Sequence, residues 1–163
     1  MTMRTKQVLG IATAALLAMG LAGCAGSAGA GQQTSALPAK DEVAALFTEW
    51  NAALGTGSPA AVADKYAADA VLLPTVSNEV RTDRAAIIRY FETFLAKKPS
   101  GEILTRSVNV LDADSATDNG TYRFRFGDGT TVDARYSYVY ERRDGRWLIV
   151  SHHSSAMPEQ PAA

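Results

Sequence analysis

Apolar residues in the first half of the chain recur at steps of three and four, the spacing of helices that bury one face. The clearest case is residues 40–54, where a first helix is predicted. Its buried face consists of Val43, Leu46, Phe47, Trp50 and Leu54. Glycines at positions 55 and 57 follow at once, which favours an end to the helix there.

Two further helices are predicted before residue 100. Ser58 and Pro59 are typical of the cap and first turn of a short helix, which we expect to end near Tyr66. A brief apolar strand at residues 71–73 follows. A third helix is then expected from a cap at Thr82 to the lysines that precede Pro99, because its apolar residues again keep helical spacing.

From residue 102 onward the pattern changes to strict alternation, which indicates β-strands. Four strands are predicted, over residues 102–111, 116–126, 131–141 and 146–155. Asp- and Gly-containing turns separate them, so consecutive strands are expected to be antiparallel neighbours. A twisted antiparallel sheet with the helices on one face, an α+β fold, buries all of these apolar stripes.

Alternation also assigns side chains to the two faces of this sheet. The inward face is expected to carry Tyr122, Tyr136, Tyr138, Tyr140 and His152. The last strand begins apolar on both faces, so we expect its outer face to be covered as well, by another subunit. The residues expected at that interface are Arg123, Arg135, Trp147, Ile149 and His153.

The N-terminus has the pattern of a bacterial lipoprotein signal. Basic residues precede an uncharged apolar run, which ends in Leu-Ala-Gly and then Cys24, the only cysteine of the chain. We therefore predict a signal peptide over residues 1–23 and lipid on Cys24, with an ordinary signal and a chance cysteine as the alternative. The expected location is the bacterial cell envelope, anchored to the membrane on its extracytoplasmic side.

Composition divides the rest of the chain. Residues 24–39 are mostly Gly, Ala, Ser, Gln and Thr and are predicted to form a flexible tether. One domain is expected over residues 40–158, with a disordered tail at 159–163. The formal net charge is −1, and removal of the basic signal makes the chain more acidic, so nucleic acid is not an expected partner.

Several kinds of chemistry find no support in the sequence. His152 and His153 are adjacent on a predicted strand, so their rings point to opposite faces and cannot hold one metal ion together. Neighbouring residues on a strand also do not present the hydrogen-bond geometry of a catalytic triad, so neither histidine is expected to form one with Ser154 or Ser155. No glycine-rich phosphate loop or dinucleotide fingerprint is present. We expect no metal and no cofactor.

The remaining candidates are phenols and an imidazole on the inward face. Such groups orient a small ligand, or transfer protons if a carboxylate joins them. The expected pocket residues are Trp50, Asn51, Tyr122, Tyr136, Tyr138 and His152. His152 and Asp69 are the candidate catalytic bases. For each of these residues taken alone, an ordinary role in the core or on a loop is the alternative.

The order of elements and several segments resemble the nuclear transport factor 2-like, or SnoaL-like, superfamily. Within it the similarity is to the calcium/calmodulin-dependent protein kinase II association domain and its stand-alone bacterial relatives. The similarity covers about residues 41–158. It is carried by Phe47-x-x-Trp50-Asn51-x-Ala53-Leu54, residues 66–74, Tyr90-Phe91 and, most specifically, Arg142-Arg143-Asp144-Gly145-Arg146-Trp147-x-Ile149-Val150-x-x-His153-x-Ser155.

The resemblance implies a cone-shaped fold, in which a strongly curved antiparallel sheet wraps around three helices and encloses a deep pocket. It also implies a homodimer or higher oligomer that packs through the outer sheet face. It does not imply a kinase, because the catalytic kinase motifs are absent from the sequence. Association domains of the kinase carry pocket arginines that can grip a carboxylate. The matching positions here hold Phe124, Tyr138 and Ser154, so an acidic ligand is not implied.

The function expected from this sequence is a lipid-anchored envelope protein that binds a small molecule in its pocket, acts as an oligomerisation module, or does both. An acid-base enzyme of the SnoaL-like isomerase or dehydratase type, or of the oxidoreductase-like type, is the alternative. A purely structural protein with a filled interior is a third possibility. Fold analogy alone supports none of the catalytic activities.

Overall fold

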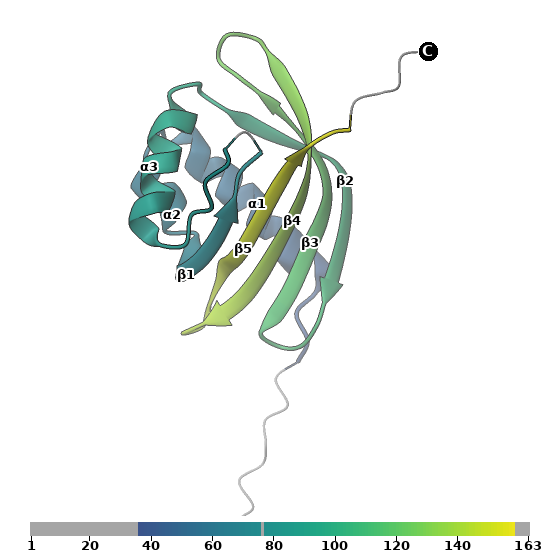
Figure 1. Cartoon of the computed structure of the whole chain (residues 1–163). Helices are drawn as coiled ribbons and strands as arrows, with labels where there is room; N and C mark the ends of the chain where they lie inside the picture. Colours follow the sequence, from purple (N-terminus) through teal and green to yellow (C-terminus); the bar gives the residue numbers. More distant parts are fainter. Residues whose placement is uncertain (1–35, 76, 159–163) are drawn as a thin grey trace, which may run out of the picture. The chain divides into compact units, whose positions relative to one another are not determined.

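The structure is a computed structural model that describes residues 36–75 and 77–158. The predicted signal peptide, Cys24, most of the tether and the tail lie outside these residues. The elements, in chain order, are α1 (Lys40–Gly55), α2 (Pro59–Ala63), β1 (Tyr66–Leu73), α3 (Arg84–Leu95), β2 (Ser100–Val110), β3 (Ser115–Arg125), β4 (Thr131–Arg143) and β5 (Arg146–Ala156) (Figure 1). None of the helices in this described part is long and apolar enough to cross a bilayer.

The strands form one curved sheet with the order β1-β5-β4-β3-β2. Strands β2 to β5 are antiparallel neighbours, which confirms the predicted succession of hairpins. Strand β1 instead lies parallel to β5 at the edge of the sheet. It begins at Tyr66, so it is longer than the expected apolar run and the preceding helix α2 is shorter.

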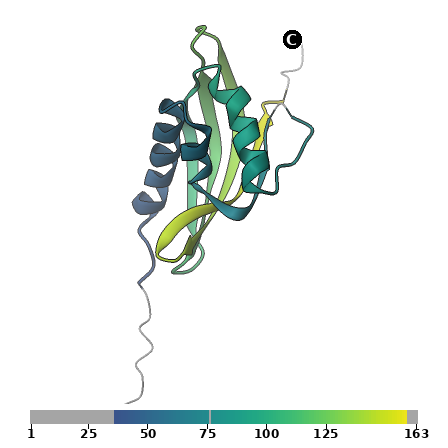
Figure 2. The ribbon, with the colours of Figure 1, turned by 90° about the vertical axis from the view of Figure 1, so that its left-hand side faces the viewer.

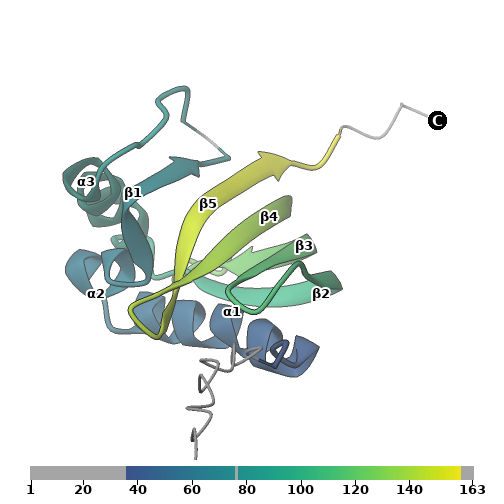
Figure 3. The same ribbon diagram turned by 90° about the horizontal axis from the view of Figure 1, so that it is seen from below.

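All three helices lie on the same side of the sheet (Figures 2 and 3). The α+β prediction, with a curved sheet around three helices, is thereby confirmed. The local sequence explains the helix starts. Ser58 caps α2 as predicted, because its side chain accepts a hydrogen bond from the amide of Ala61. Helix α3 is capped by Asp83 rather than by Thr82, through a 2.8 Å bond from the amide of Ala86.

The core is an aromatic layer between α1 and the inner face of the sheet. Trp50 is 2% exposed, and its ring meets Phe91, Phe124 and Tyr138 edge-on at centroid distances of 6.3, 6.3 and 5.8 Å. Such edge-to-face pairs add to the free energy gained by burying large rings. The alternating tyrosines of β3 and β4 face this layer, as predicted.

A bulge between β4 and β5 changes which side chains of β5 face the core. Tyr138 pairs with His152, but Tyr140 pairs with Ile149, so Val150 is the extra residue. Ile149 is consequently on the inner face and is 2% exposed. Trp147 also lies on the helix side of the sheet, where its indole N–H donates a hydrogen bond to Glu42 of α1 at 2.8 Å. The prediction that Trp147 and Ile149 lie on the outer face is therefore wrong.

Candidate ligand-binding cavity

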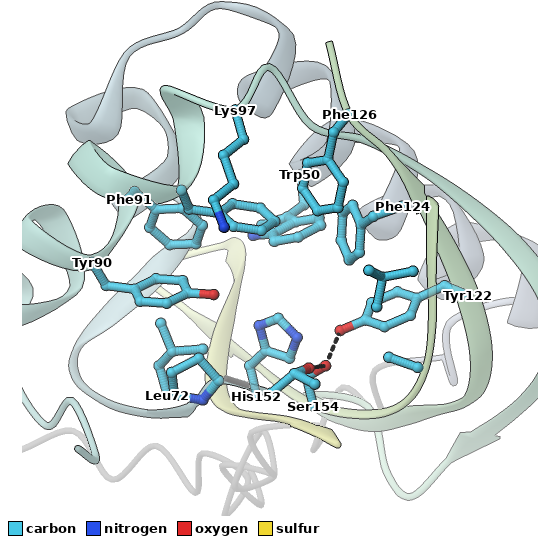
Figure 4. A pocket seen from close by; sticks show the side chains of 15 residues that line it. Trp50, Leu72, Tyr90, Phe91, Lys97, Tyr122, Phe124, Phe126, His152 and Ser154 are labelled. Atoms are coloured by element: carbon cyan, nitrogen blue, oxygen red, sulfur yellow. Dashed lines mark hydrogen bonds between the residues drawn. The ribbon is translucent and has the colours of Figure 1, made fainter. Parts of the chain in front are cut away.

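A cavity of about 130 Å³ lies between helix α3 and the inner face of the sheet. Its wall is mostly aromatic and aliphatic, and Figure 4 shows the rings gathered around a central space. The lining residues are Trp50, Leu72, Pro74, Thr75, Tyr90, Phe91, Phe94, Lys97, Tyr122, Phe124, Phe126, Val132, Ala134, His152 and Ser154. Every element except α2 and β2 contributes at least one of these side chains.

The imidazole of His152 is the main polar group inside the cavity. It projects from β5 into the space (Figure 4) and is 4% exposed. The ring of Tyr138 stacks on it at a centroid distance of 4.1 Å, and Trp50 meets it edge-on at 5.5 Å. Burial lowers the pKa of His152 from its ordinary 6.5 to about 3, with a smaller contribution from the neighbouring His153. The ring is therefore uncharged at neutral pH.

Nδ1 of His152 is hydrogen-bonded, but Nε2 is not. The Tyr66 hydroxyl lies 2.9 Å from Nδ1, and the same hydroxyl accepts the indole N–H of Trp50 at 3.1 Å. Nε2 is buried and has no hydrogen-bond partner in the described part of the chain. A buried polar atom without a partner is uncommon in folded proteins and calls for an explanation.

Three hydroxyl groups form a second polar feature beside the imidazole. Tyr122 donates to Ser154 at 2.5 Å (Figure 4). Ser154 is hydrogen-bonded in turn to Thr75. Burial raises the pKa of the Tyr122 phenol above its ordinary 10, although the bond to Ser154 opposes this effect. These hydroxyls are therefore uncharged and largely satisfied by one another.

Helix α3 and the residues after it form the rim. Tyr90 directs its hydroxyl toward the space, and Lys97 extends over it from above (Figure 4). Burial raises the pKa of Tyr90 to about 12, so it is a neutral phenol. Lys97 is exposed, and its Nζ lies 5.9 Å from the centroid of the Phe126 ring. Among the described lining residues it is the one charged side chain.

The structure brings half of the expected pocket residues to the cavity. Trp50, Tyr122 and His152 line it. Asn51, Tyr136 and Tyr138 do not, which corrects their expected placement. Strand alternation and helix spacing identify the inward face correctly, but they do not tell which part of that face is packed solid and which part borders a space.

Each of the three other residues has a different environment. The Asn51 side chain bonds both the N–H and the carbonyl of Gly101, at 2.8 and 3.0 Å, and so ties α1 to β2. Tyr138 lies beneath the His152 ring rather than beside the space. Tyr136 faces a separate buried carboxylate on β3, Asp118, to which it donates at 3.0 Å.

Asp69 is not a catalytic base of this cavity. Its side chain is 70% exposed on β1 and forms an ion pair with Arg143 at 2.5 Å. The hydrogen bond from Arg143 lowers the pKa of the Asp69 carboxyl, so this group is a weak proton acceptor. The expectation that Asp69 serves as the base in a pocket is wrong, because β1 turns this residue toward solvent.

The part of the lining that the sequence did not reveal comes mainly from α3. Tyr90 and Phe94, like Phe91 between them, have the spacing of an ordinary buried stripe, and that pattern is the same whether a ring packs against protein or borders a space. Ser154 shares the face of His152 by alternation, and this signal was available from the sequence. From the sequence, Lys97 is expected only as one of the lysines at the end of this helix, before Pro99.

The outer sheet face carries three of the expected interface residues. Arg123 and Asp133 form a two-pronged ion pair across β3 and β4, at 2.7 and 2.8 Å. Arg135 and His153 are exposed on the same face. Within residues 36–75 and 77–158, no group of three His, Cys, Asp or Glu side chains is arranged to hold a metal ion.

Comparison with known proteins relates this chain to a described family. Residues 39–158 match the family model of the calcium/calmodulin dependent protein kinase II association domain. A comparison with curated proteins gives no match. A crystal structure of an association domain of this kind from Xanthomonas campestris is 59% identical, with a TM-score of 0.73 over 78% of this chain and 96% of the other.

More distant structures share the fold. An NTF2-like protein of unknown function from Pseudomonas putida KT2440 is 20% identical, with a TM-score of 0.66 over 77% of this chain and 93% of the other. An NTF2-like protein with a cystatin-like fold from Novosphingobium aromaticivorans is 16% identical, with a TM-score of 0.62 over 75% and 84%. With the family match over residues 39–158, the chain belongs to the calcium/calmodulin dependent protein kinase II association domain family and has its NTF2-like fold.

Proposed function

We propose that this domain binds a small, uncharged, largely apolar molecule in the cavity beside α3. The observation that carries the proposal is the space itself, about 130 Å³ within a wall of aromatic and aliphatic side chains. An apolar cavity of about 150 Å³ engineered in another protein stays free of water and binds benzene. A single aromatic ring with a short substituent is therefore the size of ligand that this cavity fits.

The charges around the cavity support a neutral ligand. His152 is uncharged at neutral pH, and the phenols of Tyr90 and Tyr122 keep their protons. A carboxylate in the interior would find no cation among the described lining residues, because Lys97 is at the exposed rim. Burying an unpaired charge is far more costly than burying a neutral polar group.

An acid-base enzyme is less well supported than a binding protein. A general base works best when its pKa is near the working pH, and the pKa of His152 is about 3. Asp69, the other candidate, lies on the surface in an ion pair. Binding without catalysis therefore accounts better for the polar groups that border the space.

Self-association is the second part of the proposal. The matched family is named for an association domain, and its likeness supports packing of this chain with itself. We place the contact on the outer sheet face, around Arg123, Arg135 and His153. These side chains project from three adjacent strands, β3 to β5, and could meet the same surface of a second copy.

Attachment to a membrane through Cys24 completes the proposal. It rests on the sequence pattern at residues 1–24 alone. The test is expression of the chain in a bacterium that processes lipoproteins, beside the variant Cys24→Ser. We expect the parent chain in the membrane fraction. After removal of the signal peptide, its first residue should be Cys24, which carries the added mass of a diacylglyceryl group and a fatty acid. Equal partition of the two chains into the soluble fraction would refute the anchor.

The cavity is tested with toluene, a neutral molecule of matching size, by isothermal titration calorimetry. Val132 lines the mouth of the cavity and is 42% exposed, so Val132→Trp is expected to block the entrance with little effect on folding. Thr131→Trp places the same ring on the adjacent exposed position and is the control. We expect toluene to bind the parent and the control but not the Val132 variant. Absence of binding to the parent chain would contradict the proposal.

A further inference from the structure

Three buried side chains form a hydrogen-bond chain that ends at His152, one of the residues that line the cavity. The indole N–H of Trp50 donates to the Tyr66 hydroxyl at 3.1 Å, and this hydroxyl lies 2.9 Å from Nδ1 of His152. Trp50, Tyr66 and His152 are 2%, 4% and 4% exposed, so water is largely excluded from these bonds. The remaining ring nitrogen, Nε2 of His152, is buried without a partner in the described part of the chain.

The direction of this chain decides where the imidazole carries its proton. An indole N–H can only donate, so the Tyr66 oxygen accepts from Trp50 and keeps its own proton for Nδ1. Nδ1 is then the acceptor nitrogen of the neutral ring, and the ring proton is on Nε2.

The opposite tautomer leaves more polar groups unsatisfied. If Nδ1 carried the proton, the Tyr66 oxygen would accept two hydrogen bonds and its own proton would have no acceptor among the bonds of the described residues. Nε2 would also be without a donor. That arrangement leaves two buried polar groups without a hydrogen-bond partner, whereas protonation of Nε2 leaves one. Each buried polar group without a partner costs free energy.

We propose that the Nε2–H of His152 is the recognition donor of the cavity, and that its ligand is a small aromatic or similarly apolar molecule with one hydrogen-bond acceptor, such as a ketone carbonyl. This inference rests on the proposed function. A ligand oxygen at Nε2 would satisfy the one polar group that the hydrogen-bond chain leaves open.

The surroundings of the ring suit a donor that is fixed before the ligand arrives. Tyr138 stacks on the imidazole at 4.1 Å and Trp50 meets it edge-on at 5.5 Å, so the ring cannot turn freely. The hydroxyls of Tyr122 and Ser154, which border the same space, already bond within their own group. A rigid donor loses little conformational entropy when it binds an acceptor.

The test compares two molecules of nearly identical shape, acetophenone and α-methylstyrene, which differ by a carbonyl oxygen in place of a methylene group. Both are titrated into the purified full chain by calorimetry. We expect acetophenone to bind about tenfold more tightly, the gain of one hydrogen bond in a buried site. A second readout is nuclear magnetic resonance of the imidazole nitrogens, in which the free chain is expected to show the Nε2-protonated tautomer.

The outcomes separate this inference from the function on which it rests. Equal affinities for the two molecules would overturn the inference and leave the cavity as a binding site. An Nδ1-protonated ring in the free chain would overturn it as well. If neither molecule binds, the proposed function fails and the inference fails with it.

One variant with a matched control tests the hydrogen-bond chain, and a third variant tests the imidazole. Tyr66→Phe removes the hydroxyl that holds Nδ1, and we expect a mixture of both tautomers in place of one. Tyr140→Phe removes a buried hydroxyl that has no partner, and it is the matched control that should keep the single tautomer. An unchanged tautomer in the Tyr66 variant would show that the chain of bonds does not set the proton. His152→Leu should bring the two affinities to within about twofold of each other, and a retained preference would refute the role of the imidazole.

Discussion

Nε of Arg106 lies 3.1 Å from Oδ2 of Asp118, a carboxylate that is 0% exposed. Tyr136 donates to the other oxygen at 3.0 Å. Burial raises the pKa of Asp118, and the positive charge of Arg106 and the bond from Tyr136 oppose that increase. The fold therefore keeps a buried acid beside α1, away from the cavity, and Arg106 is the charge that compensates it.

Replacing Arg106 by Leu should destabilise the protein by about 3 kcal/mol near pH 7.5, because it leaves a buried carboxylate without its cation. The loss should shrink in acid. As the pH falls, the Asp118 carboxyl of the folded variant binds a proton at a higher pH than the same carboxyl of the unfolded chain. Below the ordinary carboxyl pKa, Asp118 is protonated and uncharged in both the folded and the unfolded chain. Urea unfolding at about pH 7.5 and pH 4 measures both values.

The control for this variant is Arg125→Leu, which removes an exposed ion pair with Glu102. A loss below about 1 kcal/mol is expected there, because water screens exposed pairs. If the Arg106 variant lost the same stability at both pH values, the buried charge would not be the cause.

Loss of the hydroxyl should change the stability of the protein differently at two tyrosines of β4. Tyr136→Phe removes the donor to Asp118, and a cost of about 1–3 kcal/mol is expected because a buried acceptor loses its partner. Tyr140→Phe removes a buried hydroxyl that has no partner in the described part of the chain, so stability should be unchanged or slightly higher. Urea unfolding of the two variants checks this. A larger loss for Tyr140→Phe would contradict the assignment of its environment.

Gly120 of β3 is required by the close approach of β2. A Cβ atom at this position would lie 1.9 Å from the carbonyl oxygen of Thr105, a backbone atom next to the irregularity in β2. Gly120→Ala should therefore separate the strands and cost several kcal/mol, on the order of 3, as overpacking of a rigid site does. Gly55→Ala at the end of α1 meets nothing within 4 Å and should be neutral or stabilising. Thermal unfolding distinguishes the two, and equal effects would refute the argument.

Much of this fold was predictable because burial imposes a period on the sequence. The stripe of Val43, Phe47, Trp50 and Leu54 and the alternating tyrosines of β3 and β4 are buried as expected. What periodicity does not reveal is a change of phase. The bulge at Val150 shifts the pairing of β5 by one residue and turns Ile149 inward. No glycine or proline in the sequence of β5 indicates this bulge.

The site was less predictable than the fold, for a physical reason. A cavity is a place where packing is incomplete, and that depends on how several elements meet rather than on the pattern of any one of them. His152 was identified because it is a polar residue on an inward strand face. Tyr90 and Phe94 were not, because their spacing on α3 is that of ordinary core residues.

A charge at the centre of the outer sheet face should prevent self-association. Ser137 of β4 lies between Asn119 of β3 and His153 of β5 on that face. Ser137→Glu, present in both copies, would bring two carboxylates into the proposed contact, where unpaired charges are costly. Light scattering after size-exclusion chromatography should show a smaller mass than for the parent chain. Asp144→Glu, in the exposed β4–β5 turn, is the control that should leave the mass unchanged. Equal masses for all three chains would place the contact elsewhere.

His152 should make the folded state sensitive to acid. Its pKa is about 3 in the folded state, against an ordinary 6.5, because burial disfavours the charged ring. Between these two values the unfolded chain binds a proton that the folded chain does not, so stability falls as the pH falls, by about 1.4 kcal/mol per pH unit. Above the ordinary pKa the stabilisation is fully present.

His152→Asn removes the titrating group and should flatten the stability profile between about pH 6.5 and pH 4. His153→Asn, at the exposed neighbour, should keep the slope. An imidazole signal of His152 that titrates near its ordinary pKa in the folded chain would contradict its burial and, with it, the neutral ring on which the cavity depends.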